Sequence, residues 1–336
     1  MARIAFLSTA HIHTKSFLQN IAKATDGRSL CAIWDDVPAR GQQYAAEFKT
    51  TFVPDLDAVL TQSGADAFII CAENTRHLPL IEKAVTARKP IFCEKPLATT
   101  TAEARQIVRL TRRNKVKMMS GYFQPFSGAM RAVAGMLRQN EFGQVTRVLF
   151  RNAHHAAYGR WFDSPDLKWF TDPALAGGGA LMDMGTHAVH LLRTLFGPVA
   201  EVWACAANHA GIYPAVDDYA VMHLKFASGL FGTVEAAWTQ TGGAGGLEVV
   251  GSEKTLWNNG SQYVVSAPKQ QATPLVPLAD QPTRVDRLVG IVQKTVPDEE
   301  VKSDFAAAID SVAIIEAAYK SSQKGKWTKV PSIRGI

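Results

Sequence analysis

Small and polar side chains fill the turn after the first apolar segment, which runs Ser8-Thr9-Ala10-His11-Ile12-His13. A dinucleotide site needs a strand, a tight turn and a helix whose first amides face the pyrophosphate. The usual glycines are absent from this turn. Its small residues still allow close backbone approach, and the Ser8 and Thr9 hydroxyls can donate to phosphate. A turn that binds no nucleotide stays open as the alternative interpretation.

Asp35 ends the second apolar segment, about 25 residues after that turn. A carboxylate at this place accepts the ribose hydroxyls of NAD and repels the 2′-phosphate of NADP. Asp36 adds to the repulsion, and Arg40 is the nearby cation that favours NADP. The pattern therefore favours NAD over NADP. The alternative is that Asp35 only caps the next helix.

Short apolar segments alternate with helical patterns over the first third of the chain. We expect strands at 3–8, 29–35, 51–53, 67–72, 90–94 and 117–122, and helices at 13–25, 39–48, 56–62, 77–87 and 101–113. This alternation of continuous apolar strands with helices predicts an α/β domain with a doubly wound parallel sheet.

The pattern changes after residue 122. We expect helices at 126–139 and 302–322, strands at 146–153, 199–207, 219–227, 230–238 and 246–250, and loops at 242–246 and 268–282. Strands that form an antiparallel sheet, together with separate helices, predict an α+β domain. The sequence thus predicts two domains, 1–122 and 123–336.

The composition excludes several classes of protein. Apolar residues make up 47% of the 336 residues, charged residues 20%, and the net charge of +6 is spread along the chain. We therefore expect no nucleic-acid partner and no membrane association, and the positive charge suits a small anion. The N-terminus lacks the pattern of a signal peptide. Four cysteines without paired spacing suggest buried thiols in a cytoplasmic protein.

Two longer motifs are more specific. Glu94-Lys95-Pro96-Leu97-Ala98 ends one strand segment, and Gly177-Gly178-Gly179-Ala180-Leu181-Met182-Asp183-Met184-Gly185-Thr186-His187 lies in the second domain. With Asn74-Thr75-Arg76-His77 and Trp169-Phe170-Thr171-Asp172-Pro173, they resemble the Gfo/Idh/MocA family of glucose-fructose and inositol-type oxidoreductases. The resemblance covers essentially the whole chain. It implies an N-terminal Rossmann domain, a second domain with an open, mostly antiparallel sheet, a nicotinamide cofactor and a sugar or cyclitol substrate.

The resemblance also implies roles for individual residues. It makes Lys95, Asp183 and His187 catalytic, and the spacing of four puts Asp183 and His187 on one helix face. The run Gly177–Gly179 would let the chain pack closely against a ligand. The residues that we expect to bind the cofactor are Ser8, Thr9, His11, Ile12, Asp35, Cys71, Ala72, Asn74, His77, Glu94, Lys95 and Gln124.

The chemistry of these side chains supports the implied roles. Oxidation of a secondary alcohol needs a hydride acceptor and a base whose pKa is near the operating pH, which His187 provides. Lys95 can act through a lowered pKa or by polarising the forming carbonyl. Asp183 can orient its partner or bind a sugar hydroxyl. The alternative for Lys95 is an ordinary surface lysine.

Basic and aromatic residues suggest how the substrate binds. We expect it to contact Lys95, His155, Tyr158, Arg160, Trp161, Lys168, Asp183 and His187. The basic members suit an anionic sugar and the aromatic ones can stack on a pyranose, although aromatic residues also serve ordinary packing.

Two features bear on the identity of the site. His11 and His13 with His154 and His155 are a conceivable zinc set, but no cysteine joins them and the family needs no metal, so we expect none. His190 stands where the family carries aspartate. That departure puts the substrate in doubt rather than the fold.

The main prediction is an NAD-dependent oxidoreductase that oxidises a ring hydroxyl of a sugar or sugar derivative. One alternative is a redox-neutral glycoside hydrolase that uses bound NAD to oxidise a sugar carbon transiently, usually C3, so that the aglycone is eliminated. A non-catalytic sensor of NAD or sugar is disfavoured by the intact Lys95, Asp183 and His187. Relatives pair through the open sheet, so we expect a homodimer or homotetramer.

Overall fold

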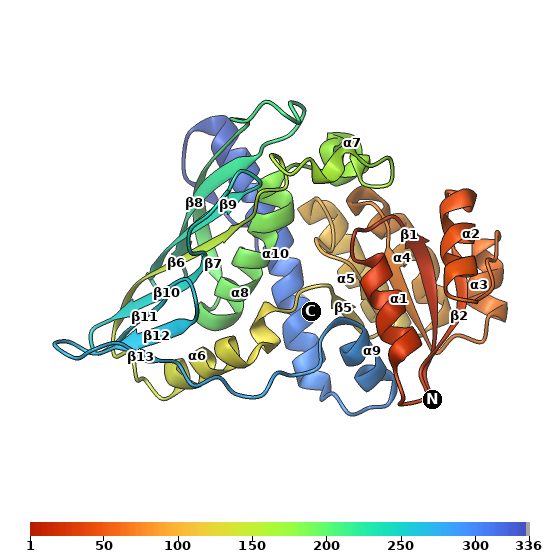
Figure 1. The fold of residues 1–336 in the computed structure, drawn as a ribbon, viewed down its shortest axis with the longest axis horizontal. Helices are drawn as coiled ribbons and strands as arrows, with labels where there is room; N and C mark the ends of the chain where they lie inside the picture. The colour runs from red at the N-terminus through yellow and green to blue at the C-terminus, as the bar shows by residue number, and fades with distance from the viewer. Residues whose placement is uncertain (334–336) are drawn as a thin grey trace.

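A five-stranded parallel sheet forms the N-terminal part of the computed structural model, which describes residues 1–333. Its strand order, β2-β1-β3-β4-β5, confirms the predicted doubly wound sheet (Figure 1). The strands are β1 (Arg3–Thr9), β2 (Ser29–Trp34), β3 (Ala67–Cys71), β4 (Ile91–Cys93) and β5 (Met118–Ser120). The strand predicted at 51–53 is only a single bridge from Phe52 to Ile33, because Pro54 follows and offers no amide for further pairing.

Helices cover both faces of this sheet. They are α1 (Thr14–Lys23), α2 (Pro38–Glu47), α3 (Leu56–Gln62), α4 (His77–Ala84) and α5 (Thr101–Asn114). The sequence explains where α5 begins: the Thr100 hydroxyl accepts from the Glu103 amide, and the Glu103 carboxylate accepts from the Thr100 amide. The helix then buries Ala104, Ile107 and Val108, spaced for one apolar face.

The second sheet has nine strands in the order β13-β12-β11-β10-β6-β9-β8-β7-β14. Its neighbours are antiparallel except β6 and β9, which run parallel, so the sheet is mixed but mostly antiparallel as predicted. Alternate side chains of β8 are buried, which shows that one face of the sheet packs on a core. The strands are β6 (Val145–Ala153), β7 (Val199–Ala207), β8 (Tyr219–Phe226), β9 (Phe231–Ala237), β10 (Gly246–Gly251), β11 (Thr255–Asn258), β12 (Tyr263–Ser266), β13 (Thr273–Pro274) and β14 (Thr328–Lys329).

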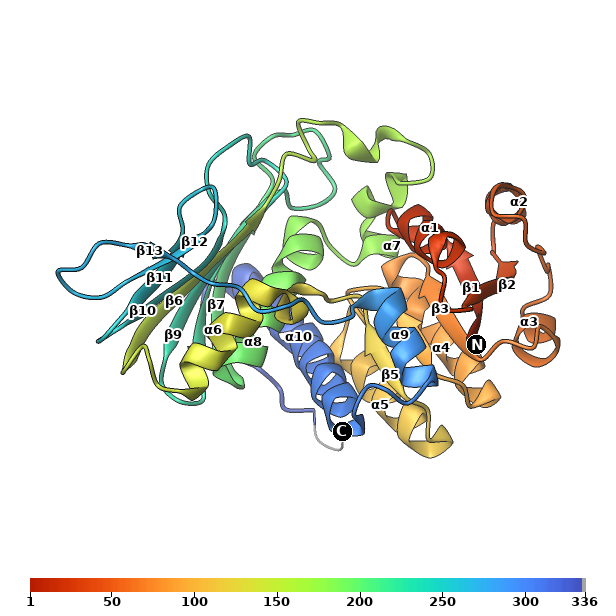
Figure 2. The same ribbon diagram turned by 60° about the horizontal axis from the view of Figure 1, so that its bottom comes forward.

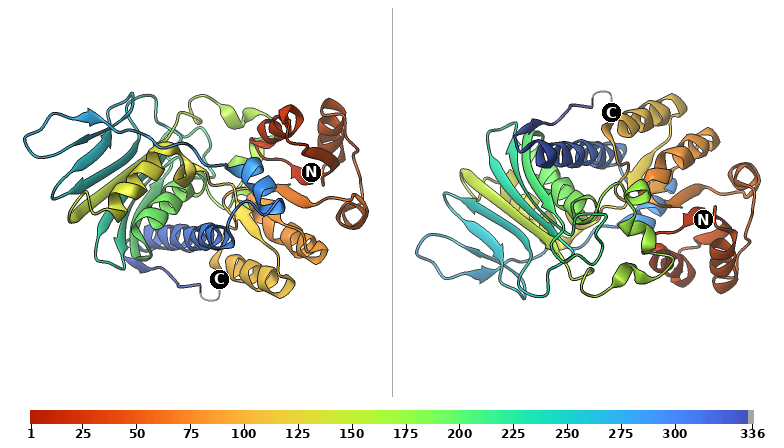
Figure 3. Two further views of the ribbon diagram at one scale, coloured as in Figure 1. Left: turned by 90° about the horizontal axis from the view of Figure 1, so that it is seen from below. Right: turned by 90° about the horizontal axis from the view of Figure 1, so that it is seen from above.

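Three helices lie between the two sheets: α6 (Gly128–Arg138), α8 (Thr186–Phe196) and α10 (Asp298–Lys324) (Figure 2). A short helix, α7 (Pro173–Ala176), lies near the N-terminal sheet. The other face of the large sheet carries no helix within residues 1–333 (Figure 3). On that open face Phe231 is 51% exposed and lies close to Trp327.

The chain returns to its N-terminal sheet near its end. Helix α9 (Arg284–Val292), which the sequence analysis did not predict, buries Leu288 and Ile291 in one core with Phe17 and Phe92. The first half of α10 packs Phe305 and neighbouring residues on the opposite side of the same sheet. The division at residue 122 stays a prediction, and residues from beyond it complete both faces of the N-terminal sheet.

Two further expectations can be compared with the fold. Cys71 and Cys93 are buried and Cys31 is half-buried, but Cys205 is exposed, because it points outward from β7 on the open face. The expectation of buried thiols is wrong for that residue. In the part of the chain that the structure describes, every helix is too short or too polar to cross a membrane.

The packing of α9 can be tested by truncating its most buried side chain. Leu288 is 0% exposed, so Leu288→Ala should lower the free energy of unfolding by about 2–5 kcal/mol, measured by urea titration. The matched control is Val276, which is 81% exposed in the segment before α9. Val276→Ala should change the free energy of unfolding by less than about 0.5 kcal/mol. Equal effects of the two substitutions would contradict this role of α9.

Candidate active site

Lys95 and Asp183 meet where the two parts of the molecule face each other. Lys95 follows β4 at the carboxyl edge of the parallel sheet, and its Nζ lies 2.5 Å from Asp183 Oδ1. The other carboxylate oxygen of Asp183 accepts a hydrogen bond from Trp238 Nε1 at 2.9 Å. Lys95, Asp183 and Trp238 are all buried. Protein groups thus provide the hydrogen bonds that this buried charge pair would otherwise make to water.

A π-helical turn, Leu181–Gly185, presents Asp183 just before α8 begins. Such turns add one residue to a helical turn and are common at functional sites. The glycines before it are needed for packing: Gly177 has φ +77°, and a Cβ on Gly179 would overlap the Asp217 carbonyl oxygen. The Asp217 carboxylate accepts from the Gly179 and Leu181 amides. The glycine run therefore packs closely against protein atoms, and its contact with a ligand stays a prediction.

Burial and charge set the protonation of the pair and of His187. Burial raises the pKa of Asp183, but the Lys95 ammonium and the bonds from Lys95 and Trp238 outweigh it and hold that pKa well below its ordinary value. Burial and the nearby Lys95 hold the pKa of His187 well below its ordinary value. Its imidazole is therefore neutral at pH 7, and its Nδ1 has no hydrogen-bond partner within the described residues. A neutral, buried imidazole beside an ammonium suits proton transfer.

These groups line a cavity of about 260 Å³. It contains six predicted site residues and His13, and its full lining is Ile12, His13, Lys95, Phe123, Gln124, Asn152, His154, Trp161, Phe162, Phe170, Asp183, Met184 and His187. The sequence analysis assigned no role to Asn152 or Trp238, and it named His154 only as a conceivable metal ligand. All three come from strands β6 and β9 or directly after them, where an alternating pattern does not tell a site residue from a core residue.

Four residues predicted to bind substrate lie outside this lining. His155, Tyr158, Arg160 and Lys168 are exposed, and Arg160 pairs with Asp163. His155 reaches only the edge of Trp161, with ring centroids 5.2 Å apart. Their roles toward substrate stay predictions.

His190, the departure from the family pattern, is also outside the cavity. It is 1% exposed, and its ring stacks on Tyr122 with centroids 4.0 Å apart. Its Nε2 lies 3.5 Å from Asp304 Oδ1 on α10. The carboxylate that the pattern lacks at position 190 is thus present nearby, from another helix.

The predicted cofactor residues gather along the carboxyl edge of the parallel sheet. Ser8 is buried and has φ +71°, the backbone conformation that glycine adopts most readily. Asp35 accepts from the Thr9 amide at 2.8 Å and from the Thr9 hydroxyl. The guanidinium of Arg40 contacts both oxygens of Asp35, at 2.8 and 3.0 Å. Arg40 also pairs with Asp36 and Glu73, so three carboxylates surround this cation.

Several buried polar atoms along this edge have no hydrogen-bond partner among the described residues. They are His11 Nε2, Glu73 Oε2, Asn74 Oδ1, Ser120 Oγ and Gln124 Oε1. Unpaired buried polar atoms are costly, and a row of them is expected where a polar ligand binds. The edge therefore fits a dinucleotide, whose ribose and amide groups offer both donors and acceptors. Ser8 and Glu94 would hold it, Thr9 and Asp35 shape the turn through their bond to each other, and the first amides of α1 suit its phosphates.

Other predicted cofactor residues have structural partners. The two ring nitrogens of His77 lie 2.9 and 3.2 Å from the carbonyl oxygens of Pro96 and Ala72. Asn74 Nδ2 donates to the Ala176 carbonyl at 2.8 Å. Cys71 and Ala72 are wholly buried. These residues shape the edge, and their contact with a cofactor stays a prediction.

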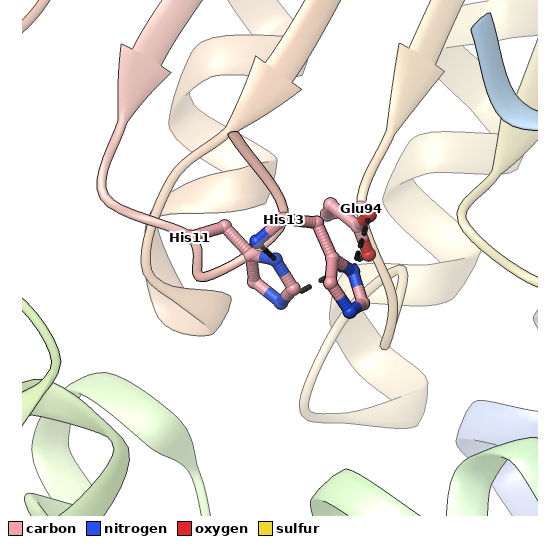
Figure 4. Close-up of side chains that lie close together, drawn as sticks. All are labelled: His11, His13 and Glu94. Carbon is pink, nitrogen blue, oxygen red and sulfur yellow. Dashed lines mark hydrogen bonds and ion pairs between the residues drawn. The ribbon is translucent and has the colours of Figure 1, made fainter. Parts of the chain in front are cut away.

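Two histidines from the turn after β1 converge on Glu94 at the end of β4 (Figure 4). The ligand atoms of His11, His13 and Glu94 all lie within 4.8 Å of one another. The conceivable zinc set differed, because it joined His11 and His13 to His154 and His155. The cluster found in residues 1–333 contains neither of those histidines.

Comparison with known proteins gives matches in both parts of the chain. Residues 3–122 match the family described as an oxidoreductase family with an NAD-binding Rossmann fold, and residues 130–257 match the GFO/IDH/MocA C-terminal domain. A solved structure, the WlbA dehydrogenase from Bordetella pertussis in complex with NADH and UDP-GlcNAcA, superposes with a TM-score of 0.81 at 21% identity. It covers 98% of this chain and 99% of that one, which shows a shared fold.

The sequence matches to curated relatives cover only part of each chain. The chain is 27% identical over 220 residues to 1,5-anhydro-D-fructose reductase of Ensifer adhaerens, which is 65% of this chain and 64% of the relative. It is 24% identical over 215 residues to 2,7-anhydro-N-acetylneuraminate hydratase of Escherichia coli (strain K12), which is 62% of this chain and 55% of that relative. These sequence matches thus span less than two thirds of the relatives' length.

The buried pair can be tested by removing one charge. Asp183→Asn leaves the Lys95 ammonium buried without a counter-charge and should lower the free energy of unfolding by about 3–5 kcal/mol, whereas adding Lys95→Met should recover part of the loss. Lys83 and Asp57 form an exposed pair, so Asp57→Asn is the control, with a cost of about 0–1 kcal/mol.

The difference in stability between wild type and Asp183→Asn should depend on pH. A carboxylate whose pKa is lowered by folding stabilises the folded state above its unfolded pKa, and this stabilisation is lost as the pH falls toward the lowered value. The difference between wild type and Asp183→Asn should therefore be full at pH 7 and shrink below the ordinary aspartate pKa of 3.8. A difference that stays constant down to pH 3 would contradict the charge pair.

Proposed function

The chain belongs to the GFO/IDH/MocA family of oxidoreductases, and we propose that it oxidises a ring hydroxyl of a sugar or sugar derivative with NAD as hydride acceptor. The observation that carries this proposal is the buried pair of Lys95 and Asp183 in one cavity with the neutral imidazole of His187. This set offers an acid, a base and a fixed charge within reach of one substrate carbon.

Each residue has a separate task in this reaction. His187 takes the hydroxyl proton, because its imidazole is neutral and lines the cavity. The Lys95 ammonium donates a hydrogen bond to the same oxygen and stabilises negative charge as the proton leaves. Asp183, fixed by Trp238, keeps the ammonium in place. When bound, the nicotinamide supplies the hydride acceptor.

The charges around Asp35 support NAD over NADP. Asp35 and Asp36 would face a 2′-phosphate with two negative charges. Arg40 and Arg76 offset only part of this charge, because the three carboxylates of Asp35, Asp36 and Glu73 share these two guanidiniums. The cluster therefore keeps an excess of negative charge, which opposes a 2′-phosphate.

A redox-neutral reaction is the second candidate. The relative named a hydratase carries a name for the addition or removal of water rather than net oxidation. Transient oxidation of a sugar carbon followed by elimination would use the same base and the same ammonium. Paired carboxylates, which ordinary glycosidases need, are not required for that route.

The assay for this proposal follows absorbance at 340 nm with NAD and NADP. Its panel contains neutral and anionic monosaccharides and their aryl glycosides, with analysis of products. Steady NADH formation with NAD and one sugar supports the dehydrogenase, whereas NAD-dependent aglycone release without net NADH identifies the redox-neutral route. Lys95→Met and His187→Gln should each lower kcat by about 10²–10⁴-fold while NADH binding, followed by fluorescence, is kept.

The pH profile and a surface variant complete this test. Because the pKa of His187 is lowered, the acid limb of kcat/KM should lie below the ordinary histidine pKa of 6.5. His209 is exposed and outside the cavity, so His209→Gln should keep full activity. Protein that binds neither NADH nor any sugar in the panel would overturn the proposal.

The open face of the large sheet supports a homodimer or homotetramer. Phe231 and Trp327 are half-exposed there, in a shallow groove with Leu149 and His223. Light scattering after gel filtration should give a dimer or tetramer for wild type and a smaller species for Phe231→Asp. Val276→Asp, on a segment away from the sheet, should leave the assembly intact. A monomeric wild type at tens of micromolar would refute this association.

A further inference from the structure

We propose that His11, His13 and Glu94 bind a divalent first-row transition-metal ion, with Zn²⁺ as the ion that this set of two imidazoles and one carboxylate suits best. The site goes beyond the proposed function, because none of its ligands is assigned to the chemistry of Lys95, Asp183 and His187. It also departs from the sequence analysis, which expected no metal.

The distances are close to those of a coordination sphere. His13 Nδ1 lies 3.1 Å from Glu94 Oε1, and His11 Nε2 lies 3.9 Å from Glu94 Oε2. Ligand atoms at 2.0–2.2 Å from a tetrahedral Zn²⁺ are separated by about 3.4 Å. The three ligand atoms lie within 4.8 Å of one another, so the widest separation must close by up to about 1.4 Å for all three to reach one ion. The contact of the His13 amide with His11 Nδ1, 3.3 Å long, must open when Nδ1 takes up the proton that metal binding removes from Nε2.

The environment favours a cation at this point. The side chains of His11 and Glu94 are 0% exposed, and His11 Nε2 faces the carboxylate without a hydrogen bond. Among the residues described, Glu94 has ion-pair contacts only with the two histidines. Lys95 is committed to Asp183, and the guanidinium of Arg284 stacks on Phe123. A buried carboxylate facing two imidazoles lacks a full counter-charge, which a divalent ion would supply.

One of the three ligands reaches the cavity. His13 lines it together with Lys95, Asp183 and His187, whereas the side chains of His11 and Glu94 are buried. Three protein ligands with a free fourth position are typical of catalytic rather than structural zinc sites. A water molecule or a substrate oxygen would fill that position from the cavity.

The test measures metal binding by cofactor-free full-length protein. After removal of metals with a chelator, Zn²⁺ is titrated in, and bound metal is counted by mass spectrometry after dialysis. We expect one Zn²⁺ per chain, visible d–d absorption with Co²⁺ in its place, and a higher Tm with either ion. Glu94→Gln and His13→Gln should each weaken binding by more than about tenfold, the loss that removing even a supporting group causes.

Matched controls separate this site from adventitious binding. His209→Gln removes an exposed histidine away from the cluster and should bind Zn²⁺ as wild type does. Should His11→Gln fail to fold because that residue is buried, the half-exposed His13 and the near-isosteric Glu94→Gln decide the result. Wild-type binding below one tenth of an equivalent, or equal binding by wild type, Glu94→Gln and His13→Gln, would falsify the site.

His11 and Glu94 belong to this proposal and to the predicted cofactor site, so the two are measured separately. NADH binding is followed by fluorescence in metal-free protein. Loss of NADH binding there would overturn the proposed function and leave the Zn²⁺ titration as it stands. Absence of Zn²⁺ binding by protein that binds NADH would overturn the metal site alone.

Discussion

The contact between Lys95 and Asp183 constrains the rest of the structure. A lysine from one sheet and an aspartate from the other half of the chain meet in the protein interior, where neither charge is stable alone. The surrounding elements hold these two side chains in contact. Strand β4 ends just before Lys95, and a π-helical turn carries Asp183. Trp238, which directly follows β9, donates a hydrogen bond to the Asp183 carboxylate. The glycine run and Asp217 anchor the turn from behind.

The turn after β1 shows how a dinucleotide-type edge can be built without glycine. Ser8 adopts a positive φ that usually belongs to glycine, which costs of order 1–3 kcal/mol for a residue with a side chain. The Asp35 carboxylate, held by the amide and hydroxyl of Thr9, ties the turn to the next strand. The turn carries the imidazoles of His11 and His13 at positions where a glycine turn would present only backbone atoms to a ligand. This edge of the sheet therefore offers two titratable side chains that a glycine turn lacks.

Much of the architecture was predictable because its causes are local. Continuous apolar strands alternating with amphipathic helices indicated the parallel sheet, and two motifs indicated that Lys95, Asp183 and His187 share a cavity. Trp238 and Asn152 were missed because each lies in or beside an alternating strand, where a side chain aimed at Asp183 or at the Met184 carbonyl looks like any inward residue. Helix α9 was missed because its apolar face is short and its partner surface lies far back in the sequence. The pairing of Glu94 with His11 and His13 depends on the order of the strands in the sheet, in which only β3 separates β1 from β4, and sequence spacing carries no such information.

The return of the chain to its first sheet affects how the protein can be made. A ribosome releases residues 1–122 long before Leu288 and Phe305, which complete the two faces of that sheet. At synthesis rates of 5–20 residues per second, the wait lasts roughly 10–40 s. During that time the N-terminal sheet exposes apolar surface that the finished molecule buries. This surface is covered only when α9 and α10 have been synthesised and pack on it. A chain interrupted before α9 would thus carry a complete dinucleotide-type edge on an incomplete core.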